Sequence, residues 1–100
     1  MKRLVVHQDA EEELGESVAF YEKRVKGLGL AFEAEIRRSF QMIQRQPELY
    51  AFHNRTPLQR FVVERFPFVI FYRDCPDHIS IVAVANAKRR PGYWRSRRTD

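Results

Sequence analysis

The stretch from residue 66 to residue 95 constrains the fold more than any other part of the chain. It begins with two apolar runs rich in Val, Ile, Phe and Tyr, which flank the turn-forming cluster Asp74-Cys75-Pro76-Asp77. Runs of this composition on either side of such a cluster predict a β-hairpin. The second run, residues 79 to 85, is nearly all apolar, as expected of a central strand that is buried on both faces or has its outer face covered.

A strand and two helices are predicted before this hairpin. Residues 4 to 6 are a short apolar run that predicts a first strand, and Asp9 is placed to cap the helix that follows. Apolar residues at helical spacing predict one buried stripe on each helix. The first stripe contains Ala10, Leu14, Val18, Tyr21 and Val25, and the second contains Leu28, Phe32, Ile36, Phe40 and Ile43. The first helix should end near Gly27 and the second before Pro47, so the two form an antiparallel helical hairpin.

The order of these elements predicts a two-layer α+β fold. Phe61 and Val63 alternate with Arg60, Val62 and Glu64 in a further strand that turns at Phe66-Pro67 and leads into the β-hairpin. The architecture is therefore a strand, an antiparallel helical hairpin and then an antiparallel β-meander, in which the helices bury their stripes on the sheet. A chain of 100 residues with 44% apolar residues fits one domain, residues 1–100.

Positive charge is concentrated in the second half of the chain. Residues 1 to 50 carry 8 Lys and Arg against 9 Asp and Glu, whereas residues 51 to 100 carry 10 against 4. Such a field attracts nucleic acid, an anionic membrane surface or an acidic protein, and does not choose among them. Apolar stretches are too short for a membrane span, and the single Cys75 suits a reducing compartment, so we expect a cytoplasmic protein that does not bind membranes.

Conventional catalytic motifs are absent from the sequence. His7, His53 and His78 have no short spacing to Cys, Asp or Glu that would suggest a metal site, and we expect no metal. The four glycines form no phosphate-binding loop, so we expect neither nucleotide hydrolysis nor a cofactor. The residues leave open whether the protein is an enzyme.

A cluster of basic and aromatic residues remains as the candidate functional surface. It contains Arg55, Arg60, Arg65, Arg73, Lys88, Arg89, Arg90, Tyr93, Trp94, Arg95, Arg97 and Arg98. Arginine binds phosphate and aromatic rings stack on bases, so the cluster could bind RNA, and the same residue types form hot spots for an acidic protein segment. Two structural alternatives are a lid over the sheet for Tyr93 and Trp94, which we favour for Trp94, and a solvated tail for Arg97 to Asp100.

The whole chain resembles the RelE/ParE superfamily of toxins from type II toxin-antitoxin systems. The resemblance rests on the order of the elements and on several short motifs. These are YE at residues 21–22, GLG..F at residues 27–32, P..Y at residues 47–50, RFPFVIFYR at residues 65–73 and AVANAKRRPGYWRSR at residues 83–97. The resemblance implies a small toxin that a cognate antitoxin neutralises in a hetero-oligomeric complex. RelE-like members cleave messenger RNA on the ribosome, and ParE-like members inhibit DNA gyrase.

Two positions depart from the pattern of the nuclease members. Val69 stands where the RelE nuclease has arginine, and Asn86 stands where many relatives have histidine. Arginine at other positions is a poor proton donor, because guanidinium stays protonated. These departures favour a ParE-like toxin acting on gyrase through the helical hairpin and a surface of Lys88, Arg89, Arg90, Tyr93, Trp94 and Arg95.

Two alternatives stay open. The first is a ribosome-dependent endoribonuclease, for which the resemblance implies Arg60, Arg65 and Arg73 as phosphate-binding groups, Arg89 as the group that stabilises the transition state, and Tyr93 as the acid. The second is a degenerate toxin that only binds its antitoxin or nucleic acid.

Overall fold

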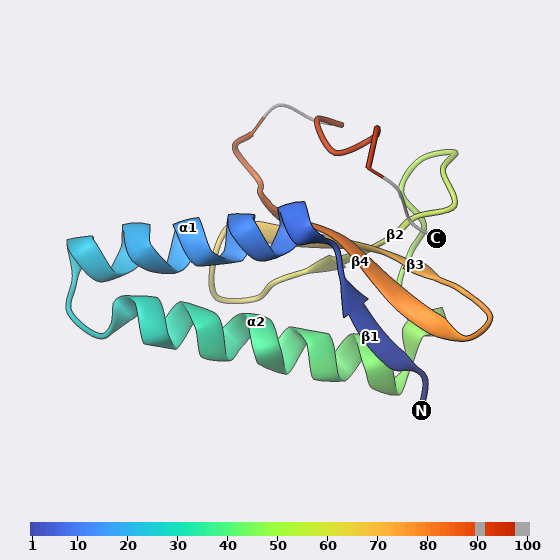
Figure 1. The fold of residues 1–100 in the computed structure, drawn as a ribbon, viewed down its shortest axis with the longest axis horizontal. Coiled ribbons are helices and arrows are strands. Elements are labelled where there is room, and N and C mark those ends of the chain that lie inside the picture. The colour runs from blue at the N-terminus through green and yellow to red at the C-terminus, as the bar shows by residue number, and fades with distance from the viewer. Residues whose placement is uncertain (90–91, 98–100) are drawn as a thin grey trace.

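A computed structural model describes residues 1–89 and 92–97. Its helices and strands follow the predicted order: β1 (Arg3–Val6), α1 (Gln8–Arg24), α2 (Leu28–Arg45), the short 3-10 helix η1 (Pro47–Leu49), β2 (Gln59–Val62), β3 (Phe68–Asp74) and β4 (His78–Asn86). Figure 1 shows α1 and α2 running side by side along the sheet, joined by a short turn. The predicted α+β class, with a helical hairpin and a meander, is confirmed.

The sheet is mixed, because β1 joins the meander as a parallel strand. The strand order is β1-β4-β3-β2, in which β2, β3 and β4 are antiparallel and β1 pairs with β4 in parallel register. Strand β4 is therefore central, and every residue from Ile79 to Ala85 is buried. Its continuous apolar sequence is explained by cover on both faces, as that run predicts.

The inner face of the sheet packs against the helical hairpin. The stripe of α2 is buried as predicted, with Phe32, Ile36 and Ile43 at 0% exposure. Helix α1 buries Ala10 and Leu14 but leaves Val25 58% exposed, because the helix ends at Arg24 and Val25 takes an extended conformation. The tips of the two helices thus extend beyond the sheet.

Helix α1 begins one residue earlier than Asp9, the predicted cap. The backbone N–H of His7 still continues the ladder of β1 with Ile81 (2.9 Å), and the His7 Nδ1 accepts a hydrogen bond from the N–H of Asp9 (3.0 Å). His7 therefore ends the strand and caps the helix at once. The chain passes from sheet to helix without a loop, and this leaves Asp9 in the first turn.

The turn between the helices depends on Glu22 and two glycines. Gly27 has a φ of 87°, a conformation that favours glycine. The carboxylate of Glu22 accepts hydrogen bonds from the N–H groups of Gly27 (2.8 Å) and Gly29 (2.9 Å), at the start of α2. A Cβ atom on Gly29 would lie 2.5 Å from the backbone oxygen of Val18, so the helices approach too closely here for a side chain.

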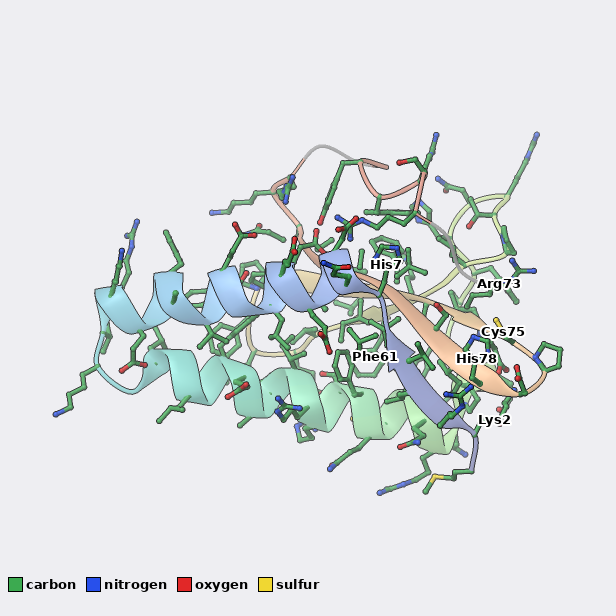
Figure 2. All side chains as sticks on the ribbon, in the orientation of Figure 1. Lys2, His7, Phe61, Arg73, Cys75 and His78 are labelled. Carbon is green, nitrogen blue, oxygen red and sulfur yellow. The ribbon has the colours of Figure 1, made fainter. Side chains whose placement is uncertain are left out.

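The N-terminal residues are tied to the turn between β3 and β4. Lys2 forms an ion pair with Asp74 and donates a hydrogen bond from Nζ to the carbonyl of Cys75 (2.8 Å). Figure 2 shows Lys2, Cys75 and His78 at this end of the sheet. No helix among residues 1–89 and 92–97 is long and apolar enough to cross a membrane.

Candidate functional site

The outer face of the sheet carries a second apolar cluster. Its buried members are Leu58, Phe71, Val82, Ala83, Ala85 and Trp94. Two neighbours in sequence, Val82 and Ala83, both belong to it because the register shifts: Phe71 pairs with Ala83 and Tyr72 with Ile81, which leaves Val82 as an extra residue. Because of this bulge, Val82, Ala83 and Ala85 all belong to the outer cluster. The outer face of β4 therefore needs a cover of its own.

Residues 92–97 provide much of that cover. Figure 1 shows this segment on the opposite side of α1 from α2. Trp94 is 2% exposed, and its ring lies 4.2 Å from that of Phe71 and 5.3 Å from that of His53, measured between centroids. The favoured prediction for Trp94, a lid over the sheet, is confirmed. Its indole ring has little surface left for a partner to contact.

A buried carboxylate, that of Glu13 in α1, holds the same segment. Arg97 donates two hydrogen bonds to it, from Nη1 to Oε1 (2.9 Å) and from Nη2 to Oε2 (3.1 Å). Tyr93 donates a short hydrogen bond from its hydroxyl to Oε2, and the Nη1 of Arg89 lies 3.8 Å from the same oxygen. Glu13 is only 7% exposed, so the charge is buried but fully paired.

The Glu13–Arg97 ion pair supplies hydrogen-bond partners to the edge of β4, where a neighbouring strand would otherwise supply them. Strand β1 pairs with β4 only as far as Ile81, and no other strand in the described part of the chain lies beside the backbone groups farther along that edge. Glu13 accepts a hydrogen bond from the N–H of Val84 (3.1 Å), and Arg97 donates one to the carbonyl of Val82 (3.0 Å). Buried backbone groups need such partners. The Glu13 carboxylate therefore stabilises the edge of β4 and also holds residues 92–97 in place.

Arg97 is not part of a solvated tail, as one alternative predicted. Its side chain is 12% exposed, and its Nε also lies 3.5 Å from Asp9. Burial lowers the pKa of Arg97, but the hydrogen bond to Glu13 and the charges of Glu13, Tyr93 and Asp9 together outweigh burial, so the pKa is raised. The rest of the predicted tail, residues 98–100, lies outside the described part of the chain.

Tyr93 is held in a protonated state. Burial raises the pKa of its hydroxyl, and the hydrogen bond to Glu13 raises it further. The guanidinium of Arg89 lies over its ring at 3.9 Å from the centroid, and that of Arg97 lies at 5.3 Å. Such cation–π contacts fix the two arginines relative to the ring.

A pocket of about 230 Å³ opens beside the segment. Its polar lining comes from β2, β4 and the irregular stretches around them, and includes His53, Arg60, Asn86, Arg89 and Tyr93. Val69 also lines it. The two positions that depart from the nuclease pattern therefore lie in one pocket with two arginines.

His53 is the pocket residue that sequence reasoning missed. Burial lowers the pKa of its imidazole, and the charges of Arg60 and Arg95 lower it further, which favours the neutral form of the ring. The ring packs edge-on against Phe71 at 5.0 Å. No residue spacing in the sequence predicts this position of His53. The residue lies in an irregular loop, and it contacts Phe71 only in the folded protein.

The structure brings together only some of the predicted functional residues. Arg60, Arg89 and Tyr93 line the pocket, whereas Arg65 lies in the turn after β2 with its guanidinium 5.5 Å from the ring of Phe66. Arg73 lines a different depression at the β2 side of the sheet. Lys88 and Arg95 are exposed near the pocket, and Arg90 lies outside the described residues.

The helical hairpin offers a second exposed surface. Phe20 is 52% exposed, Val25 58% and Leu30 68%, all near the turn between the helices. The guanidinium of Arg24 lies over the ring of Phe20 at 4.6 Å from its centroid. This tip combines apolar and basic side chains, which is typical of a surface that contacts another protein.

Comparisons with known proteins give a match in structure but none in sequence. No protein-family profile matches the chain, and no curated protein matches it significantly. A solved structure described as the chromosomal ParDE toxin-antitoxin system from P. aeruginosa contains a chain with a TM-score of 0.75 to this one. The match is 20% identical in sequence and covers 88% of this chain and 98% of the other. The predicted resemblance is thus confirmed as a shared fold, the fold of a chain in a ParDE toxin-antitoxin system.

Proposed function

We propose that this protein is the toxin of a type II toxin-antitoxin system and that it acts by binding an essential enzyme, DNA gyrase, rather than by cleaving RNA. One observation carries the choice of mechanism: the pocket has Val69 and Asn86 where proton transfer would need ionisable groups. Tyr93 lines the pocket, but its hydroxyl donates a hydrogen bond to Glu13 and so is not a free acid. A site built this way favours binding over general acid catalysis.

The surface that we assign to target binding is basic and rigidly supported. Its exposed members are Lys88, Arg89 and Arg95, and Tyr93 and Trp94 hold the segment that carries Arg95. We include Arg90 in this surface only because of its position in the sequence. The tip of the helical hairpin, with Phe20, Val25 and Leu30, would add apolar contacts. Basic and aromatic anchors with an apolar flank are the usual parts of a protein–protein hot spot.

A cognate antitoxin is the second proposed partner. The shared fold with a chain of a ParDE toxin-antitoxin system supports it. So does the charge of the second half of the chain, because an acidic segment would neutralise this field. We propose a cytoplasmic hetero-oligomer of toxin and antitoxin.

The experiment that tests the proposed function is induction of the protein in a bacterium that lacks the antitoxin. Incorporation of labelled thymidine and of labelled amino acids is followed separately. We expect DNA synthesis to stop first, and purified protein to inhibit supercoiling by gyrase. If growth and both syntheses continue, the chain is a degenerate binding module and the toxin proposal is wrong.

A ribosome-dependent endoribonuclease is the second candidate, and one feature of the pocket favours it. Arg60 and Arg89 approach the same pocket as the neutral imidazole of His53, which could accept a proton while the arginines bind phosphate. In this case protein synthesis would stop first. Arg60→Ala, Arg89→Ala and His53→Gln should then each abolish RNA cleavage, whereas loss of the hairpin tip should leave it intact.

A further inference from the structure

Glu13 connects the exposed basic surface to the body of the fold. Its carboxylate lies on α1, yet most of its partners come from the other end of the chain: Tyr93, Arg97 and, at 3.8 Å, Arg89. These partners are separated from it by as many as 84 positions in the sequence. A single buried side chain in α1 therefore connects the start of the fold to the C-terminal segment.

Two sets of contacts hold residues 92–97 in place. One is apolar and centres on Trp94, which packs on Phe71 and the outer cluster. The other is the polar network of Glu13 with Tyr93 and Arg97. The backbone hydrogen bonds from Arg95 to Gly92 and from Arg97 to Trp94 lie within the segment and give it shape but no attachment. Arg97 adds two contacts that do not involve Glu13, a hydrogen bond to the carbonyl of Val82 (3.0 Å) and an ion pair with Asp9 (3.5 Å).

The polar set also orders an arginine at the mouth of the pocket. The side chain of Arg89 is 57% exposed, and an exposed arginine ordinarily samples many rotamers. Here its guanidinium is confined between the ring of Tyr93 at 3.9 Å and the carboxylate of Glu13. A partner that binds Arg89 would meet a group that is already oriented, which lowers the entropy lost on binding.

We propose that Glu13 is a positioning residue: it docks the C-terminal segment on the sheet and thereby holds Arg89 and Arg95 in the arrangement that the target recognises. The second part of this inference rests on the proposed function. The first part, docking, is a property of the isolated protein. The two parts can therefore be tested separately.

The docking test uses Trp94, which is the only tryptophan in the sequence. We expect Glu13→Gln to shift the fluorescence emission of Trp94 to longer wavelength and to raise its quenching by acrylamide severalfold, because the segment is released. Glu12→Gln is the matched control, since Glu12 is an exposed neighbour on the same helix and the same charge is removed. Circular dichroism establishes whether each variant is folded.

Arg97→Gln keeps the test decisive if Glu13→Gln does not fold. Arg97 lies outside the helices and strands, so α1 and the sheet should stay intact when its side chain is replaced. We expect the same change in Trp94 fluorescence as for Glu13→Gln. A folded variant of either kind in which Trp94 stays buried would show that the ion pair does not dock the segment, and this would overturn the inference.

The functional test compares inhibition of gyrase by the same folded variants. We expect Glu13→Gln to inhibit at least about tenfold more weakly than Glu12→Gln, the loss typical of a released interface anchor. Released Trp94 with unchanged inhibition would overturn the positioning role. Absence of any inhibition by the unmodified protein would instead contradict the proposed function, and the fluorescence result would still decide whether Glu13 docks the segment.

Discussion

The two faces of the sheet are covered by different physical means. The inner face packs against α2 through apolar side chains such as Phe32 and Ile36, which are fully buried. The outer face is covered by a six-residue stretch that needs both the indole ring of Trp94 and the Glu13–Arg97 ion pair. Apolar packing needs only volume and shape, whereas the buried ion pair needs both partners at once. The outer face should therefore be the part of the fold that single polar substitutions can open.

The largest effect on stability is expected on the inner face. Phe32→Ala removes a fully buried ring that packs against Phe66 and Phe68 at 5.0 and 4.7 Å. The cost should be about 4 kcal/mol in the free energy of unfolding, from lost burial and the cavity that remains. Chemical denaturation measures it, with Phe20→Ala as the control at an exposed ring. Equal costs for the two variants would contradict the assigned core.

Trp94→Ala is the matching test on the outer face. It should cost about 3 kcal/mol or less, because residues 92–97 lie outside the helices and strands and can detach without unfolding the helices and the inner core. Hydrogen exchange should then show faster exchange in the segment and in β4 beyond Ile81, with the amides of α2 unchanged. If exchange accelerates throughout the chain, the two faces form one cooperative unit and the contrast drawn above is wrong.

Gly29→Ala tests the close approach of the two helices at their tip. The new Cβ would meet the backbone oxygen of Val18 at 2.5 Å, so α1 and α2 must separate, at a cost of about 2 kcal/mol. Thermal unfolding measures this loss. Gly15→Ala is the control, because its Cβ would meet nothing within 4 Å and alanine favours the helix. We expect that variant to be as stable as the parent or slightly more stable.

The smallest expected effect is a pH dependence on the outer face. The folded protein lowers the pKa of His53 below its ordinary value near 6.5, so the unfolded chain binds the proton more readily. The contribution of His53 to the free energy of unfolding is fully present above that ordinary pKa. It is lost as the pH falls through 6.5 toward the folded pKa. Stability measured between about pH 5 and 7 should rise with pH, and His53→Gln should reduce the slope. An unchanged slope would place the titrating group elsewhere.

The inner face could be predicted from the sequence, because its pattern is local. The apolar stripe of α2 repeats every three or four residues, and the β-hairpin is marked by the turn cluster at residues 74 to 77. Both signals arise within a few residues of one another, so they depend little on the rest of the chain. The parallel pairing of β1 with β4 leaves no comparable local signal.

The outer face was less predictable because its partners are distant in sequence. Glu13 stands among Glu11, Glu12 and Glu16, and helix dipole effects alone explain an acidic first turn. Only the fold reveals that one of these carboxylates is buried beside Arg97. His53 lies on the outer face for the same reason. The lid role of Trp94 was predictable, because a large amphipathic ring after the last strand favours cover over the sheet.

The long separation between Glu13 and its partners has a consequence during protein synthesis. Glu13 leaves the ribosome early, but the N–H that it binds in β4 lies 71 positions later and the guanidinium of Arg97 lies 84 positions later. Contacts of such separation form slowly, since the intervening loop must close before they stabilise anything. A nascent chain can build its helical hairpin before these partners are synthesised, yet the contacts that hold residues 92–97 can form only after Arg97 has been made.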